Sequence, residues 1–194
     1  FGVSWESGAG AVFAENQALA WLVELLGWPE TAGGCFISGG TTGNLSALVA
    51  ARQFARSQRG QHPVGQWRLA CAAQAHSSVQ AAASVLDADL VIVPENDRGQ
   101  LTGEAVQSAL TRSHDVFAVV ASAGTTNAGI IDDLSGIADV CERYGIWMHV
   151  DGAYGGAALA APSVRHLFAG IERADSFIVD PHKWLFATYD CCAL

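Results

Sequence analysis

The stretch Ser176-Phe177-Ile178-Val179-Asp180-Pro181-His182-Lys183-Trp184 contains an apolar run followed by a proline, a histidine and a lysine. The apolar run predicts a buried strand, and Lys183 lies just beyond its end. Burial lowers the pKa of a lysine because it disfavours the ammonium form, and the free amine can then act as a nucleophile. Such an amine forms an imine with the carbonyl group of a substrate or a cofactor. The alternative interpretation is a surface lysine whose aliphatic stem lies along the strand end.

Outward from this stretch, short apolar runs alternate with segments of helical periodicity. Strands are predicted at 35–37, 68–73, 90–93, 116–121, 146–150 and 176–180, and helices at 11–27, 44–58, 78–86, 102–112, 133–144 and 163–169. Strands separated by helices of this length form βαβ units. The predicted fold class is therefore α/β, a three-layer, mainly parallel sheet with helices on both faces. In such sheets ligands bind beyond the carboxyl ends of the strands.

The composition indicates one domain with a large core. Hydrophobic residues make up 51% of the 194 residues and charged residues only 15%. No apolar run reaches the roughly 18 residues that a membrane span needs. The net charge of −9 argues against nucleic acid or an anionic membrane as partner. The five cysteines lack the spacing of metal ligands, so no metal is expected, and they indicate reduced thiols in a cytoplasmic protein.

Polar motifs follow several of the predicted strands. Ser38–Asn44 is rich in glycine and hydroxyl groups, which suits an anion at a helix N-terminus and also suits an ordinary capped turn. His76 follows another strand, where it could stack on a flat ligand, act as an acid or base, or be structural. Thr126 lies in the turn 124–129, which could supply donors to a ligand or lead into the next helix.

Asp151 ends the predicted strand 146–150 and is followed by the small residues Gly152 and Ala153. A carboxylate in this position is costly unless it pairs with a cation or a strong donor. A protonated pyridine nitrogen would use it, and the small residues leave room for a flat ring. The anion cradle, the histidine, the carboxylate and the lysine each follow a separate strand, and together they predict a single ligand site.

These motifs resemble those of the group II amino-acid decarboxylases, which depend on pyridoxal 5'-phosphate (PLP). That family includes the aromatic-L-amino-acid, histidine, glutamate and cysteine-sulfinate decarboxylases. The resemblance rests on Ser38–Asn44, His76–Val79, His149–Tyr154 and Pro181–Trp184, and it runs from about Trp21 to the end. It implies the large PLP-binding domain of the fold-type I transferases. It also implies decarboxylation of an L-amino acid to the amine and carbon dioxide, through a Schiff base on Lys183.

The resemblance further implies a role for each motif residue. The catalytic residues would be Lys183, His76 and Asp151. Asp151 would pair with the pyridine nitrogen, while His76 and Ala153 would lie on opposite faces of the ring. The residues that contact PLP would be Gly40, Thr41, His76, Thr126, Asp151, Ala153, His182 and Lys183.

Two positions depart from the family pattern. Asp180 stands where many members carry an asparagine near the phosphate, and a carboxylate there would repel the phosphate unless it is shielded. The turn Gly39–Asn44 differs from the version rich in serine, glutamate and alanine that the animal aromatic enzymes carry, so the resemblance does not fix an aromatic substrate.

The family also implies a cytoplasmic homodimer that takes a small amino-acid substrate. Residues 1–194 are expected to be part of a single large domain, with an N-terminal segment and a C-terminal small domain missing. The sequence begins at Phe1 without an initiator methionine, and it stops inside a predicted strand. The alternatives are another PLP-dependent reaction, namely that of a transaminase, a carbon–carbon lyase or an aldehyde synthase, and a non-catalytic fragment.

Overall fold

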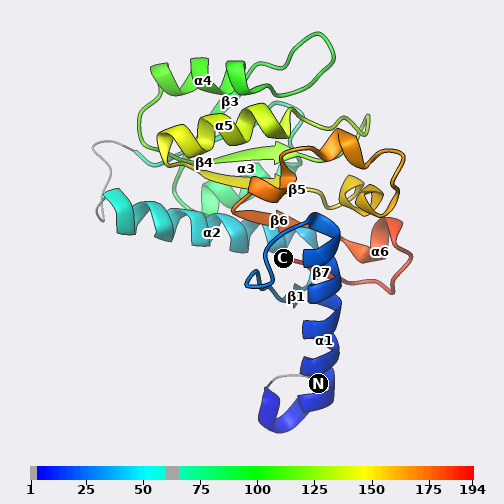
Figure 1. Ribbon diagram of the computed structural model, residues 1–194. Helices are drawn as coiled ribbons and strands as arrows, with labels where there is room; N and C mark the ends of the chain where they lie inside the picture. Colours follow the sequence, from blue (N-terminus) through cyan, green and yellow to red (C-terminus); the bar gives the residue numbers. More distant parts are fainter. Residues whose placement is uncertain (1–3, 60–65) are drawn as a thin grey trace.

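A parallel sheet forms the centre of the molecule. The computed structural model describes residues 4–59 and 66–194. Within them, five strands pair in the order β3-β2-β4-β5-β6, and every neighbouring pair is parallel (Figure 1). The strands are β2 (Arg68–Ala72), β3 (Asp89–Val93), β4 (Val116–Ser122), β5 (Trp147–Asp151) and β6 (Ser176–Ile178). The predicted parallel sheet is confirmed, with strand ends within two residues of the expected positions.

Helices cover both faces of this sheet (Figure 1). One face carries α4 (Gly103–Arg112) and α5 (Leu134–Tyr144), and the other carries α2 (Gly39–Arg59) and α3 (Ser77–Val85). Successive strand residues point to opposite faces, so Ala70 packs on the α4/α5 side and Leu69 on the α2/α3 side. The three-layer arrangement predicted from the sequence is therefore present.

Two short strands continue the sheet beyond β6. β1 (Phe36–Ile37) and β7 (Cys192–Ala193) form an antiparallel pair. The N–H of Val179 donates to the carbonyl of Ala193 at 3.0 Å, and the N–H of Ala193 donates back at 2.8 Å. Segments from opposite ends of the chain therefore close this side of the sheet.

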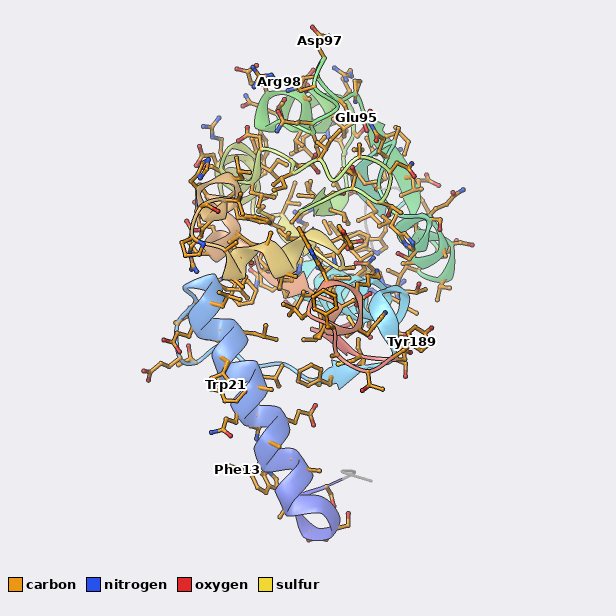
Figure 2. All side chains as sticks on the ribbon, turned by 90° about the vertical axis from the view of Figure 1, so that its right-hand side faces the viewer. Phe13, Trp21, Glu95, Asp97, Arg98 and Tyr189 are labelled. Atoms are coloured by element: carbon orange, nitrogen blue, oxygen red, sulfur yellow. The ribbon has the colours of Figure 1, made fainter. Side chains whose placement is uncertain are left out.

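The helix α1 (Trp5–Leu26) projects from the α/β body (Figure 1). It contacts the core through Leu19 and Leu26, which are both buried. Phe13 and Trp21 are 61% and 64% exposed and lie on the projecting part (Figure 2). Neither α1 nor any other helix in the described part of the chain is long and apolar enough to cross a membrane.

The helix α2 begins earlier than the sequence predicts. It starts at Gly39 instead of about residue 44, so the glycine-rich segment is helical rather than a turn. Its glycines allow close packing on β6 and β7, because a Cβ on Gly43 would lie 2.9 Å from Cγ2 of Ile178 and 3.0 Å from Sγ of Cys192. The glycines at the start of α2 predict a turn from the sequence, but in the structure they allow the helix to pack closely on β6 and β7.

The helix predicted at 163–169 is wrong in type. The chain forms only a short 3₁₀ turn there, Arg165–Phe168, which ends before Gly170 with φ of 98°. Three further short elements were not predicted: the 3₁₀ turns Gly155–Ala160 and Ile171–Arg173, and the one-turn helix α6 (Pro181–Trp184).

Candidate active site

A cavity of about 410 Å³ lies at the carboxyl ends of the parallel strands. It is lined by residues from the N-terminus of α2, the ends of β4 and β5, and the segment around α6. The structure brings together all eight residues predicted to contact a ligand: Gly40, Thr41, His76, Thr126, Asp151, Ala153, His182 and Lys183. The rule that strand ends converge on one edge of a parallel sheet explains how residues so distant in sequence meet.

The N-terminus of α2 forms one wall of the cavity. The first N–H groups of a helix have no partner within the helix, so they can bind an anion. Gly40 lets the backbone come close to the opposite wall, since a Cβ there would lie 3.0 Å from Oδ2 of Asp180 and 3.3 Å from Cβ of Ala153. Any larger residue at position 40 would therefore fill part of the cradle.

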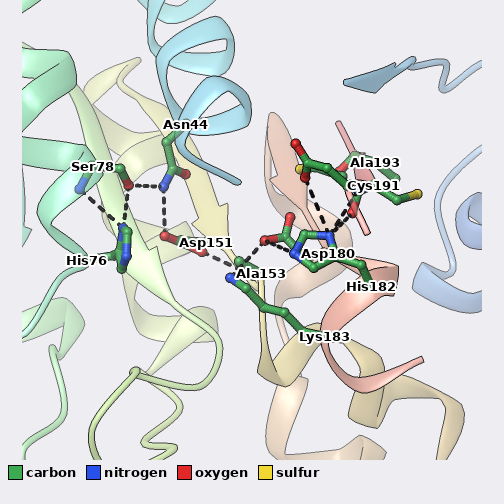
Figure 3. A network of polar contacts seen from close by, with 12 residues as sticks. Asn44, His76, Ser78, Asp151, Ala153, Asp180, His182, Lys183, Cys191 and Ala193 are labelled. Atoms are coloured by element: carbon green, nitrogen blue, oxygen red, sulfur yellow. Dashed lines mark hydrogen bonds and ion pairs between the residues drawn. The ribbon is translucent and has the colours of Figure 1, made fainter. Parts of the chain in front are cut away.

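Asp151 is the last residue of β5, and both of its carboxylate oxygens accept hydrogen bonds (Figure 3). Oδ1 accepts from the N–H of Ala153 at 3.1 Å, and Oδ2 accepts from Nδ2 of Asn44 at 2.8 Å. The residue is 8% exposed, so these two donors offset part of the cost of burying the charge. The carboxylate is held in one orientation at the floor of the cavity, where it can pair with a cationic ligand group.

His76 caps the N-terminus of α3 with its own ring (Figure 3). The N–H of Ser78 donates to Nδ1 of His76 at 3.2 Å, and Oγ of Ser78 lies 2.8 Å from the same atom. Asn44 donates to that Oγ at 2.8 Å. His76 and Asp151 are thus tied to the same asparagine.

Lys183 lies on α6, and its Nζ is 2.8 Å from Oδ2 of Asp180 (Figure 3). The burial expected for this lysine is not observed, because its side chain is 37% exposed. Asp180 is instead the buried partner, at 1% exposed, and its Oδ1 accepts no hydrogen bond from the described residues. His182, beside them, accepts from the N–H of Cys191 at 3.0 Å.

Several residues around the cavity belong to motifs quoted from the sequence but were assigned no role there. Tyr154, which lines the cavity, stacks on Trp184 with ring centroids 5.0 Å apart. Asn44 joins Asp151 to the rest of the site from α2, and nothing in the motif Ser38–Asn44 signals this contact. His149 is fully buried behind Asp151, and its position two residues earlier on the same strand was a usable signal, because both side chains share a face. Burial lowers the pKa of His149 to about 4, against the opposing effect of the Asp151 carboxylate.

Comparison with known proteins gives a consistent result. The model of the pyridoxal-dependent decarboxylase conserved domain matches residues 1–194. The chain is 36% identical to the aromatic-L-amino-acid decarboxylase of Bacillus atrophaeus, over 98% of this chain and 40% of that protein. It is 38% identical to the cysteine sulfinic acid decarboxylase of Rattus norvegicus, over 94% of this chain and 39% of that protein.

Solved structures with the same fold cover nearly the whole of this chain. The structure of Oryza sativa TDC with PLP superposes with a TM-score of 0.91 at 30% identity, covering 99% of this chain and 46% of that one. Mouse CSAD superposes with a TM-score of 0.87 at 33% identity, covering 98% of this chain and 42% of that one. The chain thus spans less than half the length of these relatives.

Proposed function

The chain belongs to the pyridoxal-dependent decarboxylase family, and we propose that it is the PLP-binding part of an enzyme that decarboxylates an L-amino acid. One observation carries the proposal. The N-terminus of α2, His76, Asp151 and Lys183 come from separate elements and line a single cavity at the strand ends. We also propose that residues 1–194 are part of one large domain.

The residues around the cavity fit PLP. The α2 N-terminus, with Gly40 and Thr41, would hold the phosphate, because it offers backbone N–H groups in a space that a Cβ would fill. Asp151 would hold the pyridine nitrogen, since both of its oxygens are already fixed as acceptors. His76 and Ala153 would contact the two ring faces, and Thr126 and His182 would line the rest of the site.

When bound, PLP supplies an electron sink for the electron pair left behind by the departing carboxylate. Asp151 would keep a proton on the ring nitrogen and so keep the ring cationic. Lys183 would supply the amine that holds the cofactor and exchanges with the substrate amine. Before the cofactor binds, the Lys183 ammonium lies 2.8 Å from Asp180 and offsets the charge of that buried carboxylate.

The assignment of Lys183 can be tested without ambiguity, because it is the only lysine among the 194 residues. The protein is incubated with PLP, reduced with borohydride and mapped by mass spectrometry. A phosphopyridoxyl group is expected on Lys183 and is expected to be absent from a Lys183→Arg variant. No label on the wild-type protein, or a label elsewhere, would contradict the proposal.

The bond that is broken is tested by the products. Incubation with a panel of L-amino acids should release an amine and carbon dioxide in equal amounts. A keto acid would indicate a transaminase instead, and an aldehyde would indicate an aldehyde synthase. Cleavage of the amino acid into two fragments without release of carbon dioxide would indicate a carbon–carbon lyase. Recovery of unchanged amino acid would indicate an inactive protein.

We further propose that the functional unit is a cytoplasmic homodimer. The exposed apolar side chains of α1, Trp5, Phe13 and Trp21, support this, because a second copy would remove them from water. Sedimentation should give a dimer, and Trp21→Glu should weaken it, whereas an active monomer would refute the idea. Fractionation of the source cells tests the compartment.

A further inference from the structure

His149 lies at the centre of a row of hydrogen bonds that begins at Trp147, the first residue of β5. Nε1 of Trp147 donates to Oγ of Ser176 at 2.8 Å, and the same Oγ lies 2.8 Å from Nδ1 of His149. On the other side of the ring, Nε2 of His149 lies 2.8 Å from Oδ1 of Asn44. His149 and Asn44 are 0% and 1% exposed, so the centre of the row is shielded from water.

Asn44 continues the row in two directions. One hydrogen of Nδ2 is donated to Oδ2 of Asp151 and the other to Oγ of Ser78, both at 2.8 Å. Ser78 in turn contacts Nδ1 of His76 at 2.8 Å. A single amide therefore links the group expected at the pyridine nitrogen to the group expected on the ring face.

The donor and acceptor of each hydrogen bond in this row can be assigned from one group that can only donate, the backbone N–H of Ser78. The backbone N–H of Ser78 points at Nδ1 of His76, so that nitrogen is an acceptor and the ring proton is on Nε2. The hydroxyl of Ser78 then donates to the same nitrogen, and its oxygen must accept from Nδ2 of Asn44.

The remaining bonds are then fixed in turn. Because Nδ2 of Asn44 faces Ser78 and Asp151, its Oδ1 faces His149 and must accept from an Nε2–H. Nδ1 of a neutral His149 accepts from the hydroxyl of Ser176, whose oxygen accepts from Trp147. The reverse amide orientation would place two oxygens 2.8 Å apart at Asp151.

We propose that Asn44 and His149 are positioning residues: His149 orients the Asn44 amide, which holds Asp151 as a hydrogen-bond acceptor and directs the Ser78 hydroxyl toward His76. This inference rests on the proposed function, since it assigns supporting roles around the same cavity. His149 must be neutral for the row to hold, and burial, which lowers its pKa to about 4, keeps it neutral near pH 7. Nε2 of His76 has no hydrogen-bond partner among the described residues, so its N–H is free to face a ligand.

The tautomers can be measured directly. Protein labelled with ¹⁵N-histidine is examined by magic-angle-spinning NMR at pH 7, with and without PLP, and signals are assigned from single histidine variants. We expect His76 and His149 to carry their proton on Nε2 and to have an unprotonated Nδ1. The exposed His114 and His166 serve as internal references. A proton on Nδ1 of His149, or on both of its nitrogens, would overturn the proposal.

Variants test the effect on the cofactor. Asn44→Asp removes the donor to Asp151 and places a second carboxylate beside it. We expect PLP to bind about 10- to 100-fold more weakly, because a hydrogen bond to a charged group is lost and two like charges face each other. Asn96→Asp is the matched control, because its exposed Oδ1 accepts from backbone N–H groups and the carboxylate retains this. Equal PLP affinity in Asn44→Asp and wild type would refute the role.

His149 is tested by a pair of variants. Glutamine can place an N–H where Nε2 lies, so His149→Gln should keep PLP affinity within about threefold, whereas His149→Leu should weaken it as much as Asn44→Asp does. Equal PLP affinity in the two His149 variants would overturn the role of this residue.

Failure of borohydride labelling, together with the expected histidine tautomers, would count against the proposed function alone. Labelling of Lys183 with a different tautomer of His149 would count against this inference alone.

Discussion

Replacement of His149 by glutamine should make the protein less sensitive to acid. The imidazole is fully buried and its folded-state pKa is about 4, whereas an unfolded histidine titrates near 6.5. The folded pKa is depressed, so the unfolded chain binds more protons between these values, and stability falls as the pH falls through this window. At pH 4 the wild-type protein should have lost about 3 kcal/mol of its pH 7 stability through His149 alone.

The glutamine variant lacks this loss but has a small cost of its own. Glutamine can replace the donor to Asn44 but leaves the hydroxyl of Ser176 without its acceptor, which should cost about 1 kcal/mol at pH 7. The variant should therefore be less stable than wild type by about 1 kcal/mol at pH 7 and more stable by about 2 kcal/mol at pH 4.

Urea denaturation of the PLP-free protein at several pH values between 4 and 7 measures this difference. The exposed His166→Gln variant is the control for the chemical change itself. The reasoning would be refuted if the free energies of unfolding of wild type and His149→Gln differed by the same amount at every pH. That result would mean that His149 has the same pKa in the folded and the unfolded protein.

Three further substitutions have defined outcomes. Gly40→Ala places a Cβ 3.0 Å from Oδ2 of Asp180, so PLP should bind about tenfold more weakly with little change in urea midpoint; unchanged affinity in a spectroscopic titration would contradict this. Gly103→Ala would collide with the backbone carbonyl of Gly136 between α4 and α5 and should destabilise the fold by about 3 kcal/mol in urea denaturation, whereas a native midpoint would show that the helices can move apart. Phe117→Ala empties a site that is 1% exposed and should cost about 3–5 kcal/mol, and a loss below about 1 kcal/mol would mean that the core collapses around it.

The sequence was sufficient for the sheet and for the edge at which the site forms. Asp151 and Lys183 both line the cavity at this edge, as expected for residues that follow apolar runs, because parallel strands present their carboxyl ends to one side. The environment of Lys183 could not be predicted in the same way. Its exposure depends on the one-turn helix α6 and on pairing with Asp180, and neither leaves a periodic pattern in so short a segment.

The supporting groups were beyond a sequence argument for a different reason. Asn44 meets Asp151 across 107 positions of the chain, so nothing near either residue signals the contact. The start of α2 was missed because glycine disfavours helices, whereas here the packing of Gly43 against Ile178 outweighs that preference. Local propensity fails where distant packing decides the conformation.

The pairing of β1 with β7 has a consequence for how the chain folds as it is synthesised. Phe36 leaves the ribosome early, yet its strand partner, Ala193, follows about 160 residues later. At about 5–20 residues per second this delay is roughly 8 to 30 seconds, during which β1 has no partner among the described strands. The wall of the cavity formed by α2 follows directly after β1, so we expect a nascent chain to pair its central strands before β1 and this wall are fixed by β7.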